Sequence, residues 1–198
     1  LVQEAVLAAM TRARRRQLHR AAFEALSARA SVTPADAGTL TQHAFEGEQW
    51  AAAARHALAA MAYAIARSEN KEALRLFELG LGAAGRIEPE AEQLGNELAL
   101  RLEALGAQMA LGRFDDIIAN LEQAQAITHL LGDLRRQAGV AVQLAVTHWG
   151  CGNFSQGLAV ATHAGEVAAA AGSRSVQMAA GVARMMHNHA LGRYADAQ

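Results

Sequence analysis

One short residue pattern occurs three times in the second half of the chain, at intervals of forty residues. It is a glycine, any residue and an aromatic ring, and its copies are Gly112-Arg113-Phe114, Gly152-Asn153-Phe154 and Gly192-Arg193-Tyr194. Gly132 and Gly172 lie halfway between the copies. Because glycine just past the end of a helix adopts the left-handed conformation without steric cost, two glycine turns per period predict two helices per unit.

The segments between these glycines have helical periodicity. After Phe114 the apolar side chains follow the i, i+3, i+4, i+7 spacing of an amphipathic helix, at Ile117, Ile118, Leu121 and Ala124. No stretch alternates with a period of two, so we expect no strand. Helices are expected at about residues 2–10, 11–29, 34–46, 49–67, 70–84, 89–111, 114–131, 134–151, 154–171 and 174–191, with a new one starting at Tyr194.

Helices of similar length that are joined by short turns pack antiparallel, and a repeated pair must stack on its neighbour to bury its apolar stripe. The predicted fold is therefore an all-α, right-handed α-solenoid. We divide it into an amino-terminal helical segment, 1–88, and repeats in 89–198. The repeat units are 89–131, 134–171 and a truncated 174–198.

The truncation predicts that the chain is a piece of a longer protein. The last unit stops a few residues into its second helix, which leaves the apolar side chains Val182, Met185 and Met186 without a covering helix. We expect self-association through this end, or fraying there.

The repeats resemble the tetratricopeptide repeat in its roughly forty-residue bacterial form. The resemblance is carried by Leu105-Gly106, Gly112-Arg113-Phe114, Ala124 and the closing Leu130-Leu131-Gly132-Asp133. The Leu-Gly step lies one residue closer to the turn than usual, and Gly157 stands where the second helix normally has alanine. The resemblance implies that the first helix of each pair lines a concave surface that grips a partner segment.

The amino-terminal part resembles the segment that follows the ATPase module in large bacterial signalling proteins. In these proteins a nucleotide cyclase or DNA-binding domain is joined to a STAND-type ATPase and then to a tetratricopeptide-like arm. The motifs that carry the resemblance are Leu1-Val2-Gln3-Glu4-Ala5-Val6, Thr11 to His19, Gln42-His43-Ala44-Phe45-Glu46 and Ala64 to Ala73. The resemblance implies a cytoplasmic, regulatory scaffold in signal transduction.

Composition narrows the function classes. With 18 basic and 19 acidic residues the formal net charge is -1, which removes the long-range field of a dedicated nucleic-acid binder. A single cysteine excludes a disulfide framework. No segment carries the roughly 20 strongly apolar residues of a membrane span, so we expect no membrane partner and a cytoplasmic location.

The sequence offers no convincing catalytic, cofactor or metal site. Gly80 to Gly85 fits the dinucleotide fingerprint, but it follows a helical segment where the motif needs a strand, so we expect its glycines to fray and end a helix. His187 and His189 are two apart on a helix and point to different sides. His148 and Cys151 are three apart without an acidic neighbour in sequence, so we expect a packed thiol. We therefore predict a non-catalytic domain without cofactors.

The forty-residue period instead yields two sets of equivalent positions near the ends of successive first helices. We interpret both sets as a groove for a protein or peptide partner. The alternative is that both pack against the adjacent helix. One set is Met109, Trp149 and His189, and the other is Gln108, His148 and Asn188.

The densest charge run is a group of five arginines in residues 12–20. Arg12, Arg16 and Arg20 share one helix face by i, i+4 spacing, which makes them candidates for a contact with a neighbouring domain. A solvated face is the simpler interpretation of this run. A helical-repeat nucleic-acid-binding module is the alternative function, although the run lacks interleaved aromatic residues and the domain has no net basic charge.

Overall fold

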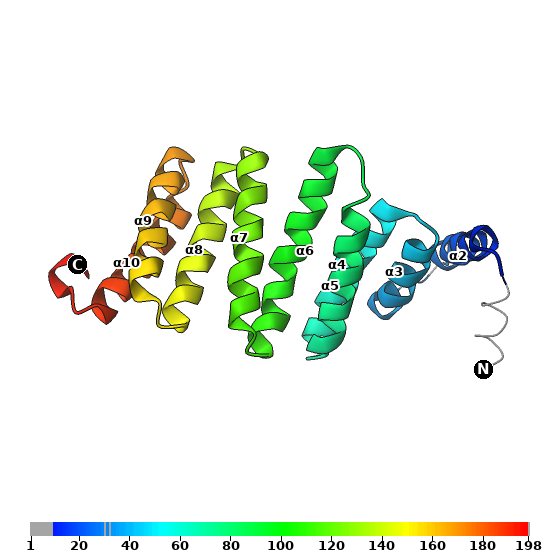
Figure 1. Cartoon of the computed structure of the whole chain (residues 1–198), viewed down its shortest axis with the longest axis horizontal. Helices are drawn as coiled ribbons and strands as arrows, with labels where there is room; N and C mark the ends of the chain where they lie inside the picture. The colour runs from blue at the N-terminus through cyan, green and yellow to red at the C-terminus, as the bar shows by residue number, and fades with distance from the viewer. Residues whose placement is uncertain (1–9, 30, 32, 198) are drawn as a thin grey trace. The chain divides into compact units, whose positions relative to one another are not determined.

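The computed structural model describes residues 10–29, 31 and 33–197, and in this part of the chain it contains helices and turns but no strand (Figure 1). The all-helical fold is thereby confirmed for the described residues. The helix expected at 2–10 lies outside them. The elements are α2 (Arg12–Ser27), η1 (Pro34–Asp36), α3 (Ala37–Glu46), α4 (Trp50–Ala66), α5 (Asn70–Ala84), α6 (Glu90–Ala110), α7 (Phe114–Leu130), α8 (Leu134–Gly150), α9 (Phe154–Ala170), α10 (Arg174–Ala190) and η2 (Tyr194–Ala197).

These bounds lie within a few residues of the expected ones, with two differences in helix type. The segment expected as one helix from 34 to 46 begins with a 3-10 turn, η1, before α3. Thr33 precedes it, and its backbone N–H donates to the Asp36 carboxylate at 2.8 Å, while Pro34 takes the first position, where no N–H is needed. Tyr194 starts a single 3-10 turn, η2.

All five repeat glycines, from Gly112 to Gly192, take a positive φ. Each turn has the hydrogen bonds of a Schellman motif: at the first one, Arg113 N donates to Gln108 O at 2.9 Å. Two earlier turns use this geometry without glycine. Glu48 (φ 57°) and Ser68 (φ 61°) occupy the left-handed position there. The periodic turn therefore extends into the amino-terminal half, although the glycine pattern does not.

The chain forms two compact units, Leu1–Ala107 and Gln108–Gln198, so the boundary falls inside α6. The division at residue 88 stays a prediction. In the first unit, α4 packs against α3 and α5. Its core combines alanines, such as Ala53, Ala57 and Ala104, with a few large side chains, such as Met61, Leu76 and Leu100.

The glycines of the fingerprint lie inside α5 or at its end: Gly85 caps the helix, as expected, whereas Gly80 and Gly82 lie within it and do not fray it. A Cβ on Gly80 would lie 2.7 Å from Leu100 Cδ2 and 3.0 Å from Ala57 Cβ. Gly80 therefore lets α4 and α6 approach α5 closely. The helical context leaves no strand-to-helix turn for a pyrophosphate.

In the second unit, α8 packs against α7, α9 and α10 (Figure 1). Buried alanines form two groups of its core, Ala141–Ala164–Ala180 and Ala145–Ala161–Ala183. None of the helices in the described part of the chain is long and apolar enough to cross a membrane.

Gly157 of α9 lies against a buried histidine of α10. A Cβ on residue 157 would lie 2.0 Å from His187 Cε1, and the His187 side chain is fully buried. A glycine at position 157 thus has a local steric cause.

Candidate functional site

Near the carboxyl-terminal ends of α6, α8 and α10, the residues of the first predicted set, Met109, Trp149 and His189, are exposed at positions forty residues apart. Met109 is 50% exposed and Trp149 is 42% exposed. His189 is also exposed and stacks edge-to-face on Tyr194, with 5.4 Å between ring centroids. All three belong to the unit Gln108–Gln198. This first set of predicted groove residues is accessible to a partner.

The second set, Gln108, His148 and Asn188, is buried, with at most 5% exposure, so its interpretation as part of an open groove is wrong. Two of these side chains link a helix to the segment after its turn. Gln108 Oε1 accepts a hydrogen bond from Asn120 Nδ2 at 3.3 Å, and Asn188 Nδ2 donates to Asp196 O at 2.9 Å. Their role is internal because a partner cannot reach them.

His148 is the exception in this set, since neither ring nitrogen has a hydrogen-bond partner. Burial lowers the pKa of His148; nearby Glu122 opposes this shift and His187 adds to it. The imidazole is therefore kept neutral. Cys151, the residue that caps α8, is exposed, which corrects the expectation of a packed thiol.

An apolar pocket of about 360 Å³ opens beside Trp149, near the lower end of the roughly 300–1,000 Å³ range of small-ligand pockets. The aromatic of the repeated turn pattern, Phe154, contributes to it, although the sequence suggested only a structural role for that ring. The lining residues are Trp149, Phe154, Met185, Met186, His189 and Ala190.

The outer face of α10 is apolar and exposed. Met178 is 73%, Val182 52% and Met185 46% exposed, at i, i+4 and i+7. Met186 is half-buried in the pocket. The expected exposure of Val182 and Met185 is confirmed; self-association through them stays a prediction.

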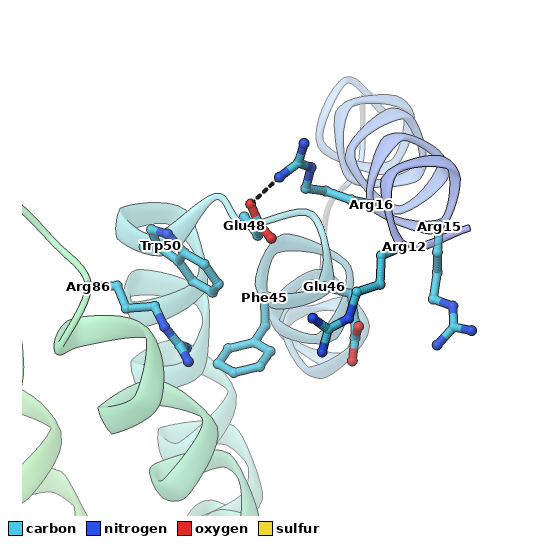
Figure 2. A pocket seen from close by; sticks show the side chains of 8 residues that line it. All are labelled: Arg12, Arg15, Arg16, Phe45, Glu46, Glu48, Trp50 and Arg86. Carbon is cyan, nitrogen blue, oxygen red and sulfur yellow. Dashed lines mark hydrogen bonds and ion pairs between the residues drawn. The ribbon is translucent and has the colours of Figure 1, made fainter. Parts of the chain in front are cut away.

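A second pocket of about 360 Å³ lies in the first unit, between α2 and the turn from α3 to α4 (Figure 2). We call it the arginine pocket. It is lined by Arg12, Arg15, Arg16, Phe45, Glu46, Glu48, Trp50 and Arg86.

None of the side chains of helix α2 is fully buried, although Phe23 packs against the core of the first unit, and polar contacts add to the attachment here. Arg16 forms an ion pair with Glu48 at 2.6 Å. Arg20 Nη2 donates to Gly47 O at 3.2 Å. A Cβ on Gly47 would lie 3.1 Å from Arg20 N, so the glycine permits this approach. Arg20 thus serves an internal contact and does not line the pocket with Arg12 and Arg16.

Two aromatic rings complete the pocket, and sequence reasoning missed both because they lie about thirty residues from the arginine run. The Arg86 guanidinium lies 4.7 Å from the Trp50 ring centroid and 5.8 Å from that of Phe45. Arg86 Nη1 also donates to Gly82 O at 3.0 Å. Figure 2 shows this guanidinium beside the two rings. Aromatic residues therefore do accompany the arginines in space.

Among the residues that the structure describes, no three His, Cys, Asp or Glu side chains are grouped so that they could hold a metal ion. No protein-family model matches the chain, and no significant match was found among curated proteins or solved structures.

Proposed function

We propose that this chain is a non-catalytic protein-interaction and regulatory domain, a tetratricopeptide-like α-solenoid arm of a larger bacterial signalling protein with a cyclase- or regulator-linked ATPase. The resemblance of the amino-terminal sequence supports the proposal that the chain belongs to such a larger protein. The recurrence of one turn geometry at Gly112, Gly152 and Gly192 supports the repeat.

The observation that carries the binding function is the alternation of exposed and buried side chains at neighbouring positions. Met109, Trp149 and His189 are exposed, whereas the residue before each of them is buried. A half-exposed tryptophan beside an apolar pocket is typical of an interaction surface, because tryptophan is enriched among residues that dominate binding energy. An apolar side chain of a partner peptide fits this pocket.

The test is selection of peptides from a random peptide library against the domain, followed by binding measurements with variants. Selected peptides should bind the wild type and lose affinity on Trp149→Ala and His189→Ala. Leu130→Ala is the matched control, because Leu130 is 69% exposed in the same unit and does not line the pocket. Equal binding by Trp149→Ala and the wild type would contradict the proposal.

The alternative function is a helical-repeat nucleic-acid-binding module. It is supported by the four arginines and two aromatic rings that line the arginine pocket. However, Arg86 already lies over the rings on which bases would stack, and Glu46 and Glu48 lie in the same pocket. A gel shift with single- and double-stranded probes at increasing salt concentrations tests this function, since phosphate binding weakens steeply with salt.

A further inference from the structure

We propose that the arginine pocket binds carboxylate side chains of an acidic peptide segment. The inference rests on the proposed function only in treating the domain as a binding module. It concerns a different unit and different residues from the surface around Trp149, so each proposal can fail without the other.

The charge balance of the pocket favours an anion. Besides Arg15, three guanidinium groups and two carboxylates line it, and one of these carboxylates, Glu48, is already paired with Arg16. Arg12 is exposed at the first position of α2, and no described residue forms an ion pair with it. A carboxylate that enters the pocket therefore meets an excess of guanidinium donors, which bind carboxylates with two parallel hydrogen bonds.

Arg86 is held in place before a ligand arrives. Its guanidinium lies over Trp50 and Phe45, and one of its nitrogens donates to Gly82 O. A side chain that is already ordered loses less conformational entropy on binding, which strengthens the interaction. Planar stacking together with directed N–H groups is a property of arginine that lysine does not share.

The same pocket disfavours a phosphate backbone. Glu46 and Glu48 would repel a chain that carries a negative charge at every unit, whereas a peptide can place single carboxylates away from them. Arg86 already lies over the Trp50 ring, so its guanidinium competes with a base for that face. An acidic peptide thus fits the pocket better than a nucleic acid does.

Glu48 controls the charge of the pocket from a backbone position that favours glycine. Its φ is 57°, the conformation that glycine provides in the later turns. Glu48→Gly therefore removes the backbone strain at this position, so this variant should fold. It also removes the carboxylate that is paired with Arg16. Ser68→Gly is its backbone control, because Ser68 has φ 61° and lies outside the pocket.

The test follows Trp50 fluorescence in a Trp149→Phe background, where Trp50 is the only tryptophan. The protein is titrated at low ionic strength with a Glu-Gly repeat peptide, a Lys-Gly repeat peptide and a single-stranded oligonucleotide. The acidic peptide should bind saturably, and the lysine peptide should not bind.

Two variants should move the affinity in opposite directions, each by about two- to fivefold, as expected for one partly exposed ion pair. Arg12→Gln should weaken binding. Arg14→Gln, with the same charge change on the same helix but outside the pocket, should not. Glu48→Gly should tighten binding, whereas Ser68→Gly and the exposed Glu78→Gln should not.

Three outcomes would overturn the proposal. The first is no saturable binding of the acidic peptide to the wild type. The second is an equal response to each variant and its control, which would indicate a general charge effect. The third is tighter binding of the oligonucleotide, which would identify a nucleic-acid surface.

Discussion

The imidazole of His187 occupies the space that a methyl group on residue 157 would need. The distance from a Cβ at this position to His187 Cε1 would be 2.0 Å. His187 Nε2 is also hydrogen-bonded to Ala145 O at 3.0 Å, so the ring is anchored on α8 while it covers the backbone of α9. The ring therefore has little freedom to yield.

Gly157→Ala should destabilise the domain by about 1–3 kcal/mol, the usual cost of overpacking a core. Alanine otherwise raises helix propensity, so a loss of stability would isolate the steric effect. Urea unfolding measures it.

Gly139 provides the control for this substitution. It lies inside α8, and a Cβ on this residue would meet no neighbouring side chain or helix within 4 Å, so Gly139→Ala should stabilise by up to about 1 kcal/mol. The double variant Gly157→Ala/His187→Ala should lose less stability than the sum of the two single variants. Additive losses would show that the two residues are not coupled.

The helices could be predicted from the sequence because their signals are local. A glycine in the left-handed conformation ends a helix wherever it occurs. The turns at Gly112 and Gly152 could therefore be predicted from the positions of these glycines in the sequence. At the turns that contain Glu48 and Ser68, the left-handed position is held by a residue other than glycine. No glycine therefore marks this position in the sequence.

The sites could be predicted only in part. The period identified Trp149 and His189, but period alone does not separate them from His148, one residue away and buried. Which neighbour faces outward depends on the packing of the following helices. The arginine pocket depends on contacts between residues far apart in sequence, such as Arg16 with Glu48 and Arg86 with Trp50.

Acidification should destabilise the second unit through His148. Its pKa is lowered in the folded state by burial, whereas in the unfolded chain it has the ordinary value of about 6.5. The unfolded state therefore binds more protons, and the free energy of unfolding should fall as the pH drops through about 6.5. Urea unfolding at about pH 7.5 and pH 5.5 measures the change.

His148→Leu should flatten this dependence and, by removing two buried nitrogens that lack partners, raise stability at neutral pH by about 1 kcal/mol. Leu130→Ala, an exposed change in the same unit that removes no titratable group, should leave the slope unchanged. If His148→Leu keeps the wild-type slope, another group carries the dependence.

Trp149→Ala should cost about 1–2 kcal/mol, less than the roughly 3–5 kcal/mol of a core tryptophan, because much of the ring is already in water. Leu144→Ala, a buried change in the same helix, should cost about 2–5 kcal/mol. Thermal or urea unfolding compares the two. A larger loss for Trp149→Ala than for Leu144→Ala would place the indole in the core.

Low pH should also loosen α2 from α3. The Nδ1 atoms of His19 and His43 lie 3.0 Å apart, an arrangement that requires at least one neutral ring. Burial and the neighbouring His19 lower the pKa of His43, so the contact is intact at neutral pH and is lost as the pH falls below about 6.5. Hydrogen exchange of residues 12–27 should accelerate there.

Arg20→Ala should accelerate exchange in α2 at every pH, because it removes the hydrogen bond to Gly47 O. Arg14→Ala is the control, since within the described residues the side chain of Arg14 is hydrogen-bonded to Gln17 of its own helix and to no other element. Unchanged protection of α2 in Arg20→Ala would show that other contacts hold the helix.

The pair Gly157–His187 has equivalents one and two periods earlier, at Ile117–Thr147 and Phe77–Ala107, and all six residues are buried. Along this series the residue on the second helix shrinks from phenylalanine to glycine, while the residue thirty positions later grows from alanine to histidine. The side chains at these equivalent positions thus differ in size from one repeat to the next, so one repeat cannot simply replace another. A chimaera that transplants residues 154–171 without residues 174–191 would separate Gly157 from His187, whose ring leaves no room for a Cβ at position 157, so the two segments must be exchanged together.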